Sequence, residues 1–115
     1  MAQENSPRTI VRYRDENGLE PFTDWFNELR DIRTQVRIAR RIDRMEAGNF
    51  GDFKSLQEGV FELRLMFGSG CRVYFAEDGK EVILLLIGGD KSSQKNDIQT
   101  AKEYWKEYQD NGQKA

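Results

Sequence analysis

Apolar and polar positions alternate along the middle of the chain in the way that β-strands require. Three strand-like runs lie between Lys54 and Lys91, namely Val60–Phe67, Cys71–Ala76 and Val82–Ile87. Successive side chains of a strand point to opposite faces, so the first two runs each carry an apolar row on one face and an arginine on the other. The third run has no polar alternate, which favours a central strand with both faces at least partly covered. These runs predict a small sheet with one packed face and one polar face.

Helical periodicity precedes the predicted sheet. Pro21 suits the first turn of a helix, and the apolar residues that follow it recur at i, i+3, i+4 and i+7. These residues are Phe22, Trp25, Phe26 and Leu29. A second helix is expected from about Ile32 until Gly48 ends it. Its expected buried line is Val36, Ala39, Ile42 and Met45.

A third helix is expected near the end of the chain, from about Gln94 to Gln109. It follows a loop in which Ser92 or Ser93 is the expected N-cap. Its expected buried residues are Ile98, Ala101, Trp105 and Tyr108. At the other end of the chain, Thr9–Arg14 is β-rich and alternates, so we expect a first strand there.

Glycine turns connect the central strands. Gly68–Gly70 separates the first two, and Asp78-Gly79 is a strong hairpin signal before the third. With the first strand and the helices, the element order is β-α-α-β-β-β-α. This order predicts an α+β fold in which the first two helices form a hairpin packed on the sheet. The length of 115 residues predicts a single domain over residues 1–115, with an ordered core of about residues 8–109.

The composition excludes several kinds of site. The 115 residues contain no histidine, which makes a histidine-containing catalytic triad and a histidine-ligated zinc site impossible. Cys71 is the single cysteine, so an internal disulfide and a thiolate cluster are excluded as well. We therefore expect no metal and no cofactor. No apolar stretch approaches the roughly 20 residues that span a bilayer, and no signal peptide is recognisable, so we expect a cytoplasmic location without membrane contact.

The polar face of the predicted sheet carries the sharpest candidate site. Arg64 and Arg72 lie on neighbouring strands, so both can reach one phosphate. Arginine suits this task because its planar guanidinium binds phosphate through two parallel hydrogen bonds and stays charged. Lys54 precedes the first of these strands and Lys91 follows the last one, so either can border the same face, on which Tyr74 also lies. This face is a candidate anion-binding surface.

The second predicted helix carries a separate row of cations. Between Arg30 and Arg44 there are six arginines against two acidic residues. The arginines that recur at helical spacing are Arg33, Arg37, Arg40, Arg41 and Arg44. Contacts of such a row with phosphates give affinity without sequence choice, so ribosomal RNA and an acidic partner are both possible ligands.

Both groups of cations also have a structural interpretation. Arg64 and Arg72 can pair with Glu62 and Glu81 as cross-strand salt bridges. A row of arginines is ordinary on a solvated amphipathic helix. The net charge of −2 is only weak support against nucleic acid, because a net-acidic protein can present a basic face. The residues alone leave the functional and the structural interpretations open.

These motifs, in this order, resemble the RelE/ParE superfamily of type II toxin–antitoxin toxins. The similarity is strongest to the phage-derived, HigB-like branch of addiction module killer proteins, and it covers roughly residues 8 to 108. The segments that carry it are Phe22–Phe26, Lys54–Leu56, Gly59–Arg64, Gly70–Phe75, Val82–Ile87, Gly88–Ser92 and Asp97–Trp105. The resemblance implies a RelE-like fold, in which a helical hairpin and a C-terminal helix pack around a small, mostly antiparallel sheet.

The resemblance implies an mRNA interferase, which is a ribosome-dependent endoribonuclease that arrests translation. The implied reaction is a metal-independent attack of a ribose 2′-OH on the adjacent phosphate, which needs a base, an acid and stabilisation of charge on the phosphoryl oxygens. By this resemblance Arg64 and Arg72 hold the scissile phosphate. Lys54 or Lys91 acts as base or acid, and Tyr74 stacks on or orients a nucleobase.

The same resemblance leaves a second activity open and implies a set of partners. ParE-type members of the superfamily are non-enzymatic and inhibit DNA gyrase or another target protein. In either case the expected partner is a cognate helix-turn-helix antitoxin, together with the ribosome and mRNA for the nuclease. DNA would be contacted only indirectly, through the antitoxin.

Overall fold

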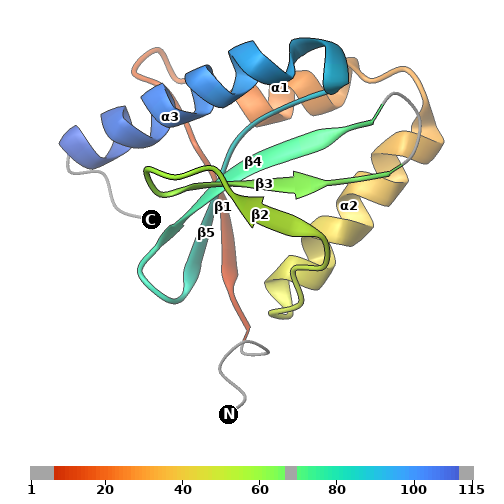
Figure 1. Cartoon of the computed structure of the whole chain (residues 1–115), viewed down its shortest axis with the longest axis horizontal. Helices are drawn as coiled ribbons and strands as arrows, with labels where there is room; N and C mark the ends of the chain where they lie inside the picture. Colours follow the sequence, from red (N-terminus) through yellow and green to blue (C-terminus); the bar gives the residue numbers. More distant parts are fainter. Residues whose placement is uncertain (1–6, 67–69, 112–115) are drawn as a thin grey trace.

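A five-stranded sheet forms the centre of the protein, with helices on both of its faces (Figure 1). The computed structural model describes residues 7–66 and 70–111. The strands are β1 (Thr9–Arg12), β2 (Phe53–Ser55), β3 (Val60–Arg64), β4 (Arg72–Asp78) and β5 (Val82–Gly89). Their order across the sheet is β1-β5-β4-β3-β2, in which β1 runs parallel to β5 and every other pair is antiparallel. The fold is mixed α+β.

Two hydrophobic cores lie on the two faces of the sheet. Helices α1 (Pro21–Glu28) and α2 (Ile32–Glu46) bury Phe22, Ile38 and Met45 against one face. Helix α3 (Gln94–Asp110), which follows the short 3-10 turn η2 (Lys91–Ser93), covers the other face with Ala101 and Tyr108. Among the helices that the structure describes, none is long and apolar enough to cross a membrane.

The strand alternation seen in the sequence is confirmed, but the expectation of one packed and one polar face is wrong over much of the sheet, because α3 packs a second core on the other face. Leu63 and Leu65 of the first run belong to the core under α1 and α2, as do Val73 and Phe75 of the second. The prediction of a central strand is also confirmed, because β5 lies between β1 and β4 and is buried from Ile83 to Leu86. Phe67 and most of the expected turn at Gly68–Gly70 lie outside the described residues.

The predicted extent of α2 is confirmed, and so are Ile42 and Met45 of its predicted buried line, but the first half of that line is wrong. Val36 and Ala39 were expected to be buried with Ile42 and Met45, yet both are exposed, and Ile38 takes their place in the core. The helix carries apolar residues on two adjacent stripes, and only one of them can face the sheet. Strand β2 was not predicted, and the order is therefore β-α-α-β-β-β-β-α.

Two adjacent glycines at the end of β5 let helices approach from both sides. A Cβ on Gly88 would overlap the ring of Trp25, and a Cβ on Gly89 would overlap the carboxylate of Asp97. Ser93 occupies the N-cap position of α3 as predicted, but its hydroxyl bonds Asp97 Oδ2 at 2.5 Å and caps no backbone N–H. This packing brings the start of α3 next to β4, where the candidate site lies.

Candidate functional site

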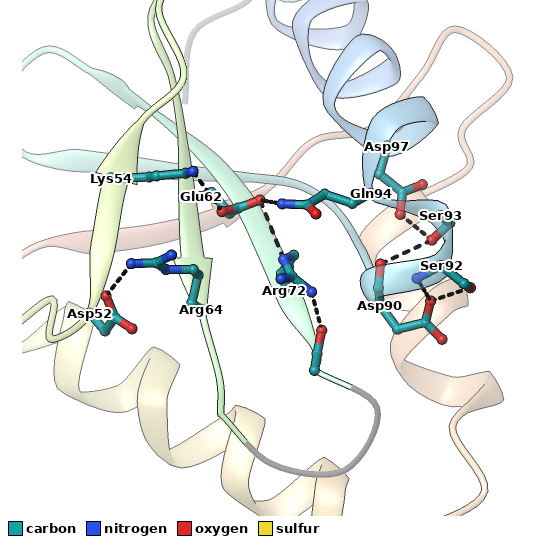
Figure 2. Close-up of polar contacts among 11 residues, drawn as sticks. Asp52, Lys54, Glu62, Arg64, Arg72, Asp90, Ser92, Ser93, Gln94 and Asp97 are labelled. Atoms are coloured by element: carbon teal, nitrogen blue, oxygen red, sulfur yellow. Dashed lines mark hydrogen bonds and ion pairs between the residues drawn. The ribbon is translucent and has the colours of Figure 1, made fainter.

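The strand register places the predicted cations on one face of the sheet. Arg64 of β3 stands directly opposite Arg72 of β4. Lys54 of β2 stands opposite Glu62 of β3, one pair further along. Because residues i and i+2 of a strand share a face, Lys54, Glu62, Arg64 and Arg72 all lie on the side of the sheet that α3 partly covers (Figure 2). We call these four residues the cationic site.

A buried carboxylate lies at the centre of the cationic site. Glu62 is fully buried, and its Oε2 accepts a hydrogen bond from the Gln94 side chain at 2.9 Å. Arg72 Nε lies 3.6 Å from the same oxygen, and Lys54 Nζ lies 4.0 Å from Oε1 (Figure 2). A buried charge requires such partners, because leaving water without compensation is costly.

Arg72 is held in place by its own strand as well as by Glu62. Its Nη1 donates to the backbone carbonyl of Gly70 at 2.6 Å, and its side chain is only 15% exposed. The Arg72 guanidinium has five N–H donors, so these contacts leave others available to a ligand. Arg72 is therefore a positioned cation at the rim of the sheet.

The side chains of Arg64 and Lys54 are more exposed to solvent than that of Arg72. Arg64 Nη2 lies 3.2 Å from Asp52 Oδ1, and both side chains of this pair are well exposed. The Lys54 side chain is 50% exposed. The exposed Arg64–Asp52 pair contributes little to stability, so Arg64 can turn to a bound anion at small cost.

Unsatisfied polar atoms concentrate in the cationic site. Among the described residues, Glu62 Oε1, Arg64 Nε and Arg72 Nε are buried atoms with no hydrogen-bond partner. In addition, Arg64 and Arg72 stand directly opposite each other, and each is paired with a carboxylate, Asp52 for Arg64 and Glu62 for Arg72. The arrangement is suited to binding an oxyanion such as a phosphate at the Arg64–Arg72 pair.

The expectation that Tyr74 lies on an open face is wrong. Tyr74 belongs to the core under α3 and is fully buried. Burial raises the pKa of its hydroxyl, and the nearby Glu62 carboxylate raises that pKa further. Alternation correctly placed Tyr74 on the same face as Arg72, but α3 covers that part of the face. In this structure the ring offers no surface on which a nucleobase could stack.

Lys91 lies on the opposite side of Arg72 from Lys54. It is the first residue of η2 and is exposed. Its Cβ is 3.8 Å from the position that a Cβ on Gly70 would take, and Arg72 Nη1 is 3.3 Å from the same position. The structure thus brings Lys91 near Arg72, but Lys91 follows β5 and Lys54 lies on β2, so strands β4 and β3 lie between them.

The arginines of α2 do not all have the same surroundings. Arg33, Arg37, Arg40 and Arg44 are exposed along one side of the helix. Arg41 instead points back to the protein, where it donates to the backbone carbonyls of Arg64 at 2.9 Å and Phe50 at 3.1 Å. Burial lowers the pKa of Arg41. Arg37, Arg40, Arg41 and Arg44 line a shallow hollow of about 250 Å³ together with Leu65 and Met66.

Two residues of the site were not among the predicted functional residues. Glu62 was predicted to be a salt-bridge partner, which it is for Arg72. Gln94 was predicted to begin the last helix, and its side chain also donates a hydrogen bond to Glu62. A signal for Glu62 was present, because it lies two positions before Arg64 and so shares its face. Glu81 does not pair with either arginine, because it lies in the turn of the β4–β5 hairpin, at the end of β4 opposite to Arg72.

Comparison with known proteins covers this whole region. A family model described as "Phage derived protein Gp49-like (DUF891)" matches residues 24–106, which include every residue of the cationic site. An uncharacterized protein of Haemophilus influenzae is 46% identical over 81 residues, a stretch that spans 70% of this chain and 82% of that protein.

Proposed function

The chain belongs to the phage-derived Gp49-like family, which is associated with toxin–antitoxin systems, and we propose that it is the toxin of a type II toxin–antitoxin pair. We further propose that it is a RelE-like member of the RelE/ParE superfamily. The mixed α+β architecture is compatible with that assignment, since two consecutive helices cover one face of a mostly antiparallel sheet and a C-terminal helix covers the other.

The proposed activity is ribosome-dependent endoribonucleolytic cleavage of mRNA, which arrests translation. The observation that supports it best is the pair of facing arginines, Arg64 and Arg72, with unsatisfied buried N–H groups on both. Two like charges on facing positions of neighbouring strands are unfavourable in themselves, and Asp52 and Glu62 each offset only one of them. An anionic substrate between the two guanidinium groups would add compensation for both charges and accept hydrogen bonds from their remaining N–H donors.

The proposed reaction is an attack of a ribose 2′-oxygen on the adjacent phosphorus. The O2′–P bond forms, the P–O5′ bond breaks, and the products carry a 2′,3′-cyclic phosphate and a 5′-hydroxyl. Arg64 and Arg72 would bind the non-bridging oxygens and stabilise the charge that develops on them. The proton of the 2′-OH must leave, and a proton must reach the 5′-oxygen.

We assign the proton transfers to the two lysines that flank the arginines. Lys54 lies on the same face as Arg64 and beside the Glu62 carboxylate, so its ammonium group is our candidate for the acid that protonates the 5′-oxygen. Lys91, on the other side of Arg72, is the candidate for the base, a role in which its amine must be neutral so that it can accept the proton of the 2′-OH. Glu62 is a positioning residue in this scheme, since it holds Arg72 from inside the protein.

A second candidate function is a non-enzymatic inhibitor that binds DNA gyrase or another target protein. One observation favours it: Arg72 already has internal partners in Glu62 and the Gly70 carbonyl, as expected of a structural residue. Under this alternative the cationic site serves the stability of the sheet and carries no substrate.

Inducible expression separates the two candidates when it is combined with primer extension on cellular mRNA. The nuclease predicts new 5′ ends within translated reading frames, whereas the gyrase inhibitor predicts intact mRNA together with double-strand DNA breaks. Arg64→Ala is the informative variant, because Arg64 pairs with the exposed Asp52 and its loss should leave the fold intact. Arg14→Ala is the control, since exposed Arg14 also forms a surface ion pair, with Glu20 at 2.9 Å, and lies outside the cationic site.

Partners follow from the proposed function. We expect a cognate antitoxin with a helix-turn-helix domain that holds the toxin inactive, and contact with DNA only through that antitoxin. The nuclease also requires the ribosome and mRNA in the cytoplasm. Co-expression with the product of the adjacent reading frame tests the first point: growth arrest should disappear and the two proteins should co-purify.

A further inference from the structure

The first half of α2 carries a row of three exposed apolar residues on a surface that is otherwise charged. Ile32 is 70% exposed and Val36 is 44% exposed, and Ala39 continues the stripe at the next turn. These residues recur at i, i+4 and i+7, so they lie in a row along the helix. The core stripe of the same helix, with Ile38 and Met45, points to the sheet. A second apolar stripe on a helix with one buried face indicates a contact with another molecule.

A row of arginines runs beside this stripe. Arg33, Arg37, Arg40 and Arg44 recur at i, i+4, i+7 and i+11, so they form a ridge on the side of α2 next to Ile32, Val36 and Ala39. All four are exposed. The 15 residues of α2 make about four turns, or roughly 22 Å, and the ridge and the stripe together extend along most of that length.

We propose that the outer surface of α2 docks an amphipathic helix of a protein partner, with acidic residues along the flank that faces the arginine ridge. The apolar stripe would accept aliphatic side chains of the partner at i, i+3/i+4 and i+7, which is the helix-in-groove mode of recognition. The charge complementarity fixes the orientation of the partner and rejects basic helices.

The apolar stripe beside the arginine ridge favours a protein over RNA as the ligand of this surface. Arginines alone would suit an RNA backbone equally well, since phosphate contacts need only positive charge. Ile32 and Val36 have no function in such a contact, and their exposure to water is unfavourable without a partner. The surface also lies on the α1–α2 side of the sheet, whereas the cationic site lies on the side of α3. A partner can therefore bind α2 while the cationic site stays accessible.

Binding of a peptide to α2 can be measured without any assay of toxicity or RNA cleavage. A negative binding result therefore refutes the docking proposal alone and leaves the proposed nuclease activity to its own test. The probe is a synthetic 20-residue peptide with leucine at i, i+3/i+4 and i+7 and glutamate on one flank. A scrambled peptide of the same composition is the control. Because a four-turn contact buries less area than a standard interface, micromolar affinity is expected. Chemical-shift changes of backbone amides, followed by NMR during titration, locate the binding site on the full chain.

Two double variants test the two halves of the surface. Ile32→Ser/Val36→Ser removes the apolar stripe, and Arg33→Glu/Arg40→Glu reverses part of the ridge. All four positions are exposed, so the fold is retained, which the NMR spectrum verifies. Each double variant should weaken binding of the probe about tenfold or more, as expected for central contacts of an interface.

Three results would overturn the proposal. One is the absence of shift changes on α2 at 1 mM probe. Another is equal binding of the scrambled peptide. The third comes from a parallel titration with an unstructured RNA oligonucleotide: if RNA perturbs the α2 amides and the helical peptide does not, the surface serves RNA.

Discussion

Arg72→Ala removes the nearest cation of a carboxylate that has no contact with water. In the wild type, Glu62 is fully buried and is compensated by Arg72 at 3.6 Å, by the Gln94 amide at 2.9 Å and by Lys54 at 4.0 Å. Without Arg72, the Gln94 amide and the half-exposed Lys54 remain as partners of this carboxylate. We therefore expect Arg72→Ala to lower the free energy of unfolding substantially.

The size of the effect follows from the burial of the pair. Breaking a buried ion pair on one side costs about 3–5 kcal/mol. The 3.6 Å separation and the remaining Lys54 place this case toward the lower end, at about 3 kcal/mol. For a domain of this size, that lowers the midpoint of thermal unfolding by roughly 10 °C. Arg14→Ala, which breaks an exposed pair, should cost less than about 1 kcal/mol.

Urea unfolding of four proteins measures the effect: the wild type, Arg72→Ala, Glu62→Leu/Arg72→Leu and Arg14→Ala. The double variant should recover to within about 1 kcal/mol of the wild type, since replacing both members of a buried pair by apolar residues is often neutral. If Arg72→Ala is no less stable than Arg14→Ala, then Arg72 does not compensate Glu62 and the description of the site is wrong.

Three further predictions concern the surroundings of the site. Gly89→Ala should destabilise the protein by about 1–3 kcal/mol in urea unfolding, because the new Cβ would overlap the Asp97 carboxylate; an unchanged midpoint would show that α3 shifts freely. Burial raises the pKa of the Cys71 thiol, so its reaction with a disulfide reagent should be slow near pH 8 and become fast in denaturing urea; an equally fast reaction in the folded protein would contradict this burial. Burial, and to a lesser degree the neighbouring Asp90, raise the pKa of Asp97 above its ordinary value of 3.8. The folded state therefore binds this proton more tightly than the unfolded state does. The stability that the bound proton contributes is lost as pH rises through the raised pKa. The stability of Asp97→Asn relative to the wild type should therefore increase from pH 3 to pH 7, and a constant difference would contradict the shift.

The sequence predicted the alternating rows of the sheet because alternation is a local property of a strand. Arg64 and Arg72 share a face for this reason, and β4 and β5 begin and end within a few residues of the predicted runs. What covers a face is not local. Tyr74 is buried and Glu62 is contacted by Gln94 because α3 returns to the sheet from some 30 residues further along the chain. No periodicity within the strands could reveal that.

For helix α2, the sequence predicts the helix but not which of its sides is buried. Its sequence contains two apolar stripes, one through Ile38 and Met45 and one through Ile32 and Val36. Periodicity identifies the helix, but it does not say which stripe faces the sheet when both are present. Strand β2 escaped detection because its three residues are too few for alternation to be recognised and are all exposed.

The most direct test of the proposed function uses purified protein in a translation extract that is actively translating a defined mRNA, with cleavage mapped by primer extension. We predict cuts within the reading frame for the wild type and for Arg14→Ala, and at least about a hundredfold less cleavage for Arg64→Ala, because one donor to the developing charge is lost. Intact mRNA with folded wild-type protein would contradict the nuclease, and equal cleavage by Arg64→Ala would contradict the cationic site.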